Sequence, residues 1–146
     1  MKAATIGMVA RPLMDIPGAA RPGGHYSHAV AANGMLYISG QLPITASGEK
    51  LTGASFEQQA GQTLQNISAI LEAAGADKSD LVQVRVYLAD VDHWPRFNDL
   101  YAQWIGDWKP ARAVVPVGAL HYGLQVEVEA VALLRDAGPA RDRTVP

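Results

Sequence analysis

The sequence contains no cysteine. This absence excludes disulfide bonds, zinc or iron–sulfur centres held by thiolates, and a cysteine nucleophile. Any catalytic chemistry must therefore come from other side chains.

Charge is also scarce. Only 18% of the 146 residues are charged, against a typical share of about 25%. Twelve basic and fourteen acidic residues give a formal net charge of −2, so no basic field indicates nucleic acid or an anionic membrane as a partner. Hydrophobic residues make up 49%, which excludes an intrinsically disordered chain. With so little charge, we expect a partner chain to cover part of the apolar surface.

Long hydrophobic runs are absent as well. No stretch approaches the roughly 20 apolar residues of a membrane span. Arg11 ends the mild run of residues 3–10 before the core of a signal peptide can form. We therefore expect a cytoplasmic protein with no membrane partner.

Proline and glycine divide the chain into three parts. Residues 1–24 carry both without hydrophobic periodicity and are predicted to form an irregular N-terminal arm. Residues 25–136 are predicted to form one domain around a single core, and residues 137–146 a flexible C-terminal tail.

Turn and capping signals place the first elements of this domain. Asn33-Gly34 separates two apolar runs and predicts a two-residue β-hairpin turn. Ser55 followed by Gln58 predicts the start of a helix with a capping box, and Gly75 predicts its end. Apolar residues recur between them at three- and four-residue steps, which predicts one face on the core.

The second half of the domain continues the alternation. A strand is predicted with Val82, Val84, Val86 and Leu88 on one face. A helix over about 92–106 and strands over 111–117 and 124–134 complete the order β-β-α-β-α-β-β. This order predicts an α+β fold with one mixed sheet and both helices on a single face. Because the strands are apolar on both sides, the other face predicts an oligomer with sites at subunit boundaries.

Three charged side chains stand out on these apolar strands. Arg112 opens a predicted strand, where an arginine loses solvation unless it meets an anion. Its planar fork suits the carboxylate of a substrate, and an internal salt bridge is the alternative. Glu127 and Glu129 share one face of the last strand. If one of them pairs with Arg112 or Arg85, the other can lie among apolar neighbours with a raised pKa, as an acid or base requires.

The remaining motifs predict no site on their own. Ser39-Gly40 lacks the glycine frame of a hydrolase nucleophile elbow, and Gly40 is interpreted as a bulge or a close backbone approach. His25 and His28 point to opposite faces of a predicted strand. The two other histidines have no carboxylate at ligand spacing, so we expect no metal. No phosphate loop or dinucleotide fingerprint occurs.

Seven segments, in order, resemble the RidA (YjgF) family of reactive-intermediate deaminases and cover nearly the whole domain. They are Tyr26-Ser-His-Ala-Val30, Leu36-Tyr-Ile-Ser-Gly-Gln-Leu-Pro43, Leu71-Glu-Ala-Ala-Gly75, Val86-Tyr-Leu-Ala-Asp90, Phe97-Asn-Asp-Leu-Tyr101, Pro110-Ala-Arg112 and Val126-Glu-Val-Glu-Ala130. Each segment is short, but seven at compatible spacing make the resemblance specific.

The resemblance implies a chorismate-mutase-like α+β fold and a homotrimer with three clefts between subunits. It also implies hydrolysis of enamines and imines, such as 2-aminoacrylate released by pyridoxal-phosphate enzymes, to 2-keto acids and ammonia. No cofactor and no metal are required for this reaction.

The resemblance also assigns residues. Arg112 matches the arginine that holds the substrate carboxylate, and Glu127 matches the glutamate that positions or activates water. The positions that line the pocket match Tyr26, Ser39, Gly40 and Asn98. A fixed carboxylate orients the imine carbon, and a nearby glutamate can order the attacking water.

The sequence departs from the family pattern near the site. His25 stands where a proline commonly precedes the tyrosine, and Ala113 and Val114 stand where hydroxyl or thiol residues often follow the arginine. Pro116 predicts a bulge or a sheet edge. These departures bear on the substrate more than on the reaction.

Three other functions stay open. A pathway-specific deaminase of a bulkier amino or imino acid, in a catabolic route, would use the same residues. A trimeric ligand-sensing or regulatory protein would hold a 2-keto acid in the cleft without turnover. A ribonuclease, an activity also attached to this family, is disfavoured by the acidic balance and the lack of a basic stripe.

Overall fold

The Asn33-Gly34 turn starts the central sheet. Both residues have positive φ angles, 52° and 72°, as a two-residue turn that matches the strand twist requires. The turn joins β2 (Ala29–Ala32) to β3 (Met35–Gln41) as an antiparallel hairpin. The prediction of a hairpin at this place is confirmed in the computed structural model, which describes residues 9–135.

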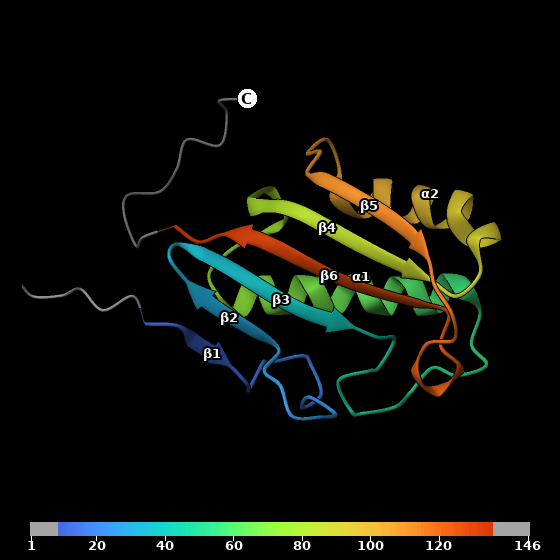
Figure 1. The fold of residues 1–146 in the computed structure, drawn as a ribbon, viewed down its shortest axis with the longest axis horizontal. Helices are drawn as coiled ribbons and strands as arrows, with labels where there is room; N and C mark the ends of the chain where they lie inside the picture. Colours follow the sequence, from blue (N-terminus) through green and yellow to red (C-terminus); the bar gives the residue numbers. More distant parts are fainter. Residues whose placement is uncertain (1–8, 136–146) are drawn as a thin grey trace, which may run out of the picture.

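The sheet has six strands in the order β1-β2-β3-β6-β4-β5 (Figure 1). β4 (Leu81–Leu88) pairs in parallel with β5 (Ala111–Pro116) and antiparallel with β6 (Val126–Leu133), so the sheet is mixed as predicted. β5 lies at the edge of the sheet, which agrees with the interpretation of Pro116.

The sixth strand comes from the N-terminal arm. β1 (Arg11–Leu13) pairs antiparallel with β2, so the arm contains a short strand where the sequence predicted irregular chain. Three residues are too few to show a hydrophobic period, and backbone pairing with β2 fixes them instead. Residues 1–8 of the arm and the predicted tail, 137–146, lie outside the described residues.

The two helices confirm the capping and periodicity signals. α1 (Phe56–Ala73) begins at a capping box in which Ser55 Oγ accepts from the Gln58 amide at 3.1 Å and Gln58 Oε1 accepts from the Ser55 amide at 3.2 Å. α2 (Trp94–Ile105) follows one 3₁₀ turn (Val91–His93). Both helices cover the same face of the sheet (Figure 1).

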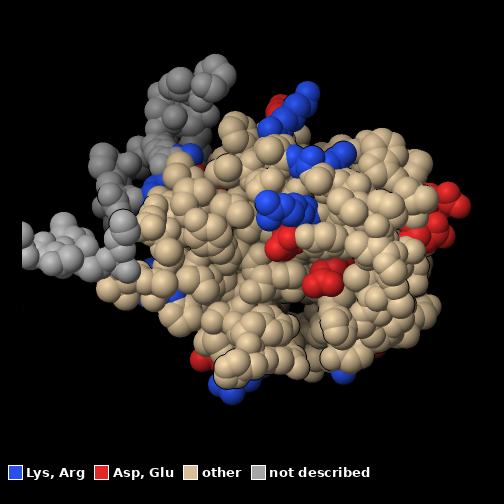
Figure 2. All heavy atoms as spheres, viewed as in Figure 1, with Lys and Arg blue, Asp and Glu red and all other residues tan. Residues whose placement is uncertain are grey.

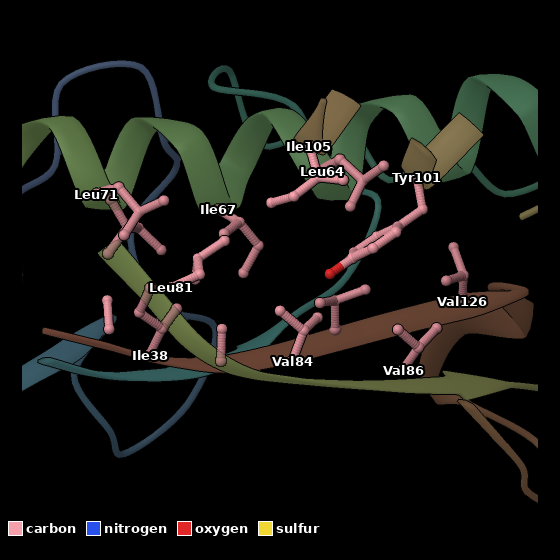
Figure 3. Packing of buried hydrophobic residues seen from close by; sticks show 14 of the residues in the cluster. Ile38, Leu64, Ile67, Leu71, Leu81, Val84, Val86, Tyr101, Ile105 and Val126 are labelled. Atoms are coloured by element: carbon pink, nitrogen blue, oxygen red, sulfur yellow. The ribbon is translucent and has the colours of Figure 1, made fainter. Parts of the chain in front are cut away.

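The hydrophobic core lies between this face and the helices (Figure 3). Leu64 and Ile67 of α1 are 2% and 0% exposed and face buried valines of β4 and β6, such as Val84 and Val126. Each such side chain contributes about 1.5–3 kcal/mol when fully buried. This core fixes the strands that carry the charged side chains of the opposite face.

One predicted inward residue, Val82, points outward. Its side chain is 45% exposed, whereas Leu81 is fully buried. The register between β4 and β6 shifts between Leu81 and Gln83, so one extra residue lies in β4. Such a bulge reverses the side of the strand on which the preceding residues lie, and Leu81 takes the place predicted for Val82.

The other face of the sheet is open in the single chain. Tyr37, Val115 and Leu133 remain 50%, 41% and 40% exposed there. Figure 2 shows this face as mostly uncharged, with a few acidic and basic side chains near its middle. The second apolar face therefore exists as the sequence indicated, and its cover by another chain stays a prediction.

Candidate functional site

Gly40 and Glu127 lie side by side on the open face, near the end of β3 and the start of β6. The register between β3 and β6 shifts between Ile38 and Gln41, which places Gly40 in a bulge. A Cβ atom added at Gly40 would lie 2.2 Å from Oε1 and 3.1 Å from Cδ of Glu127. Both interpretations of Gly40, a bulge and a close approach, are confirmed.

A cleft of about 510 Å³ opens beside this contact. Four of the predicted site residues line it together: Tyr26, Ser39, Gly40 and Glu127. A second hollow of about 380 Å³, on the side of β4, shares Gly40, Glu127 and Glu129 with the first. The two glutamates thus form a wall between two accessible spaces.

The two glutamates differ in their partners. Glu129 accepts a hydrogen bond from the Tyr87 hydroxyl and lies 3.9 Å from the guanidinium of Arg85. Burial raises the pKa of the Glu127 carboxyl above its ordinary value, nearby His121 opposes this shift, and the charge of Glu129 adds to it. Glu129 is therefore paired and Glu127 has a raised pKa, which is one of the arrangements that the sequence left open.

Ser39 contributes a fixed hydroxyl to the cleft. Its Oγ donates to the carbonyl oxygen of Ser27 at 2.6 Å. Because this bond uses the hydroxyl proton, the oxygen offers lone pairs to the cleft and suits a role in binding rather than as a nucleophile.

Arg112 lies outside this cleft. Its guanidinium carbon is 4.7 Å from the centroid of the Tyr101 ring, on the side of β5 that faces α2. Within residues 9–135 it has no ion pair, so the alternative of an internal salt bridge is not observed. Asn98, on α2, does not line the cleft either. One chain thus brings four predicted site residues together and leaves two elsewhere.

The sequence prediction missed several residues that line the cleft, among them two aromatic side chains close to Glu127 in the sequence. His121 and Tyr122 belong to a 3₁₀ turn (His121–Gly123) shortly before β6, and both line the cleft. Their position ahead of the strand that carries Glu127 was the available signal. His25, one of the departures from the family pattern, is exposed and does not line the cleft.

Residues 9–135 contain no group of three or more histidine, aspartate or glutamate side chains placed to hold a metal ion. Neither described helix combines the length and the hydropathy that crossing a membrane needs.

Known proteins resemble this chain over most of its length. The family described as Endoribonuclease L-PSP matches residues 18–134. Protein HMF1 of Saccharomyces cerevisiae is 41% identical over 111 residues, which cover 76% of this chain and 85% of that protein. The human 2-iminobutanoate/2-iminopropanoate deaminase is 39% identical over 117 residues, or 80% of this chain and 83% of that enzyme. The crystal structure of E. coli TdcF with bound serine superposes with a TM-score of 0.79 at 28% identity and covers 86% of this chain and 100% of that one.

Proposed function

Because the chain belongs to the Endoribonuclease L-PSP family, also called the YjgF/RidA family, we propose that it hydrolyses reactive 2-imino acids and their enamines to 2-keto acids and ammonia. The observation that carries the proposal is Glu127, a half-buried carboxyl with a raised pKa that lines an open cleft. Relatives named as imine deaminases at about 40% identity support it.

The proposed reaction adds water to a carbon–nitrogen double bond. An enamine such as 2-aminoacrylate first takes a proton on carbon and becomes the imine. The imine nitrogen takes a proton from solvent. A water molecule then attacks the carbon of this protonated imine, and the Glu127 carboxylate accepts a proton from the water, which gives a neutral carbinolamine. Glu127 returns its proton to the nitrogen, the carbon–nitrogen bond breaks, and ammonia leaves as the remaining hydroxyl proton passes to solvent and the carbonyl of the 2-keto acid forms. No oxidant or reductant is consumed.

The substrate carboxylate needs a cation that one chain does not place in the cleft. No lysine or arginine is among the described residues that line it. Arg112 has no anionic partner within the described chain and lies at an edge strand. We therefore place Arg112 of one subunit at the cleft of its neighbour in a cytoplasmic homotrimer, where it binds the carboxylate. The apolar open face supports such an assembly.

The test couples the protein to a source of its substrate. A serine dehydratase generates 2-aminoacrylate, and pyruvate release is followed with and without the protein. We expect acceleration by the wild type, loss in Arg112→Ala, and no change in Arg96→Ala, because the exposed Arg96 pairs with Glu57 on the helices.

Two results would contradict this function. Absence of acceleration by the wild type, with tight binding of a 2-keto acid that Arg112→Ala abolishes, would favour a ligand-sensing protein. Full activity in Arg112→Ala would remove the arginine from the mechanism.

A further inference from the structure

Two tyrosine rings flank a pair of glycines in the wall of the cleft. A Cβ atom added at Gly24 would lie 3.2 Å from Cε1 of Tyr26, and one added at Gly23 would lie 4.0 Å from the hydroxyl of Tyr122. All four residues line the cleft, and the tyrosines are 47% and 48% exposed. The glycines therefore leave open the space that side chains would fill next to the two rings.

Tyr122 is held in place by its backbone and its neighbours. Its φ angle of 62° lies in the left-handed region, which is uncommon for a residue with a bulky side chain. Its carbonyl oxygen accepts from Thr52 Oγ1 at 2.8 Å, and the Lys50 ammonium lies 4.4 Å from its ring centroid. An aromatic ring kept at a cleft by an unfavourable backbone conformation is typical of a functional position.

The cleft is large for the smallest substrate of the proposed reaction. In the single chain, before the proposed neighbouring subunit takes up part of the space, a volume of about 510 Å³ falls within the range of pockets that enclose drug-sized ligands, whereas 2-aminoacrylate has three carbon atoms. Leu42 and Ile44 add apolar lining to the same cleft as Tyr26. The space that remains beside Glu127 is therefore suited to an apolar side chain of the substrate.

We propose that this side chain is an aromatic ring bound between Tyr26 and Tyr122, so that the enzyme selects 2-imino acids derived from aromatic amino acids. The inference rests on the proposed deaminase function. Ring pairs bind through offset or edge-to-face contacts. Each such pair increases binding by about 2- to 12-fold beyond the effect of area alone.

The experiment compares two imino acids on one enzyme. An amino-acid oxidase releases the imino acid of phenylalanine or of alanine, and formation of the 2-keto acid is measured. We expect kcat/KM of the wild type to be about tenfold or more higher for the phenylalanine-derived substrate. Tyr122→Asn should lower this ratio by about 2- to 12-fold, because asparagine tolerates the left-handed backbone but lacks the ring. Trp94→Ala, which removes an exposed ring outside the cleft, should leave the ratio unchanged.

A second variant and a binding measurement make the result decisive. Gly24→Ala adds a methyl group against Tyr26 and should also lower the ratio of the two kcat/KM values. This variant keeps the test possible if the Tyr122→Asn protein does not fold. Equal kcat/KM for the two substrates, or a ratio that neither variant changes, would overturn the inference while leaving the deaminase intact. If the protein accelerates the hydrolysis of neither imino acid over the reaction without protein, the deaminase proposal fails. Calorimetric binding then tests the inference by itself, and phenylpyruvate binding no tighter than pyruvate would overturn it.

Discussion

Gly40 and Glu127 occupy adjoining space so tightly that a Cβ atom at residue 40 would lie 2.2 Å from the Glu127 carboxylate oxygen. The bulge in β3 brings the backbone this close, and only the missing side chain leaves room for the carboxylate. We regard this contact as the feature that sets the position of the proposed water-activating group.

Gly40→Ala should displace Glu127 and lower kcat. Because the nearest atom is the far end of the Glu127 side chain, which can move aside, the loss of folding stability should stay below the roughly 1–3 kcal/mol typical of core overpacking. We expect kcat to fall about tenfold or more, since a misplaced base loses much of its contribution. Turnover of 2-aminoacrylate and thermal unfolding measure the two effects.

The double variant Gly40→Ala/Glu127→Ala controls for the contact. If the clash is with Glu127, the methyl group at residue 40 should destabilise the Glu127→Ala protein much less than the wild type. An equal loss of stability in both backgrounds would show that the methyl group meets something else.

Glu127→Gln should stabilise the protein at neutral pH and remove the acidic limb of its activity profile. Burial raises the pKa of Glu127 in the folded chain above the value of 4.5 that it has when unfolded. Between the unfolded pKa and the raised folded pKa, the folded chain binds more protons than the unfolded chain, so the stability of the fold falls as pH rises. Since the carboxyl is half exposed and solvent screens it, the gain at pH 7 is about 1 kcal/mol or less. Wild-type activity should rise with pH through the raised pKa, because the carboxylate is the active form.

Unfolding midpoints and kcat/KM between pH 4 and pH 8 (roughly the range where carboxylates and histidines titrate) check both effects. Glu129, His121, Arg85 and Tyr87 also lie around this site. Glu129→Gln is therefore the matched control: it should leave the acidic limb in place. Persistence of that limb in Glu127→Gln would assign it to another group.

Tyr101 should position Arg112 through its ring and not through its hydroxyl. The guanidinium stacks on this ring, and the hydroxyl is buried without a hydrogen-bond partner among the described residues. Tyr101→Phe should keep KM within about twofold and leave stability unchanged or higher. Tyr101→Leu should raise KM by about 2- to 10-fold with a smaller change in kcat, since a cation–π contact contributes about 0.5–1 kcal/mol or more.

A wild-type KM in Tyr101→Phe beside a raised KM in Tyr101→Leu separates the positioning of Arg112 by the aromatic ring from the packing of an apolar side chain. Equal KM values for Tyr101→Leu and the wild type, in a folded protein, would show that Arg112 does not depend on the ring.

Val115→Glu should prevent assembly and abolish activity together. Val115 lies on the open face of β5, where we place the contact between subunits. A buried, unpaired carboxylate there costs several kcal/mol, and we expect this cost to prevent the subunits from associating. Val91→Glu, also at an exposed valine but in the turn before α2, should keep both the mass and the activity of the wild type. Light scattering gives the mass, and a trimer formed by Val115→Glu would contradict the assignment of this face.

Local signals in the sequence predicted those parts of the fold that depend on neighbouring residues. Asn33-Gly34 and the Ser55–Gln58 box needed only their own backbone, and both formed as expected. The bulge at Val82 depends on how β4 registers against Val131 and Ala132 of β6, which lie far along the chain, and no local pattern encodes that register.

The site divides in the same way. Alternation along the strand predicted that Glu127 and Glu129 share one face. It left open which of them pairs with an arginine; in the structure Glu129 lies by Arg85, and burial raises the pKa of Glu127. The place of Tyr122 depends on a left-handed backbone and on Thr52, 70 residues earlier, which spacing does not reveal. Within residues 9–135 Arg112 contacts the Tyr101 ring and forms no ion pair, so its proposed carboxylate ligand follows neither from the pattern nor from the geometry of one chain.

Strand β1 helps to hold the segment that forms one wall of the cleft. The amide of His28 donates to the Leu13 carbonyl oxygen at 3.0 Å, and the His28 ring lies 2.5 Å from the Ala20 carbonyl oxygen, so the segment that carries Gly23, Gly24 and Tyr26 is tied down before and after these residues. A loop anchored at both ends loses its conformational entropy when the protein folds. Ligand binding then carries a smaller ordering cost, and the wall is preorganised for its substrate.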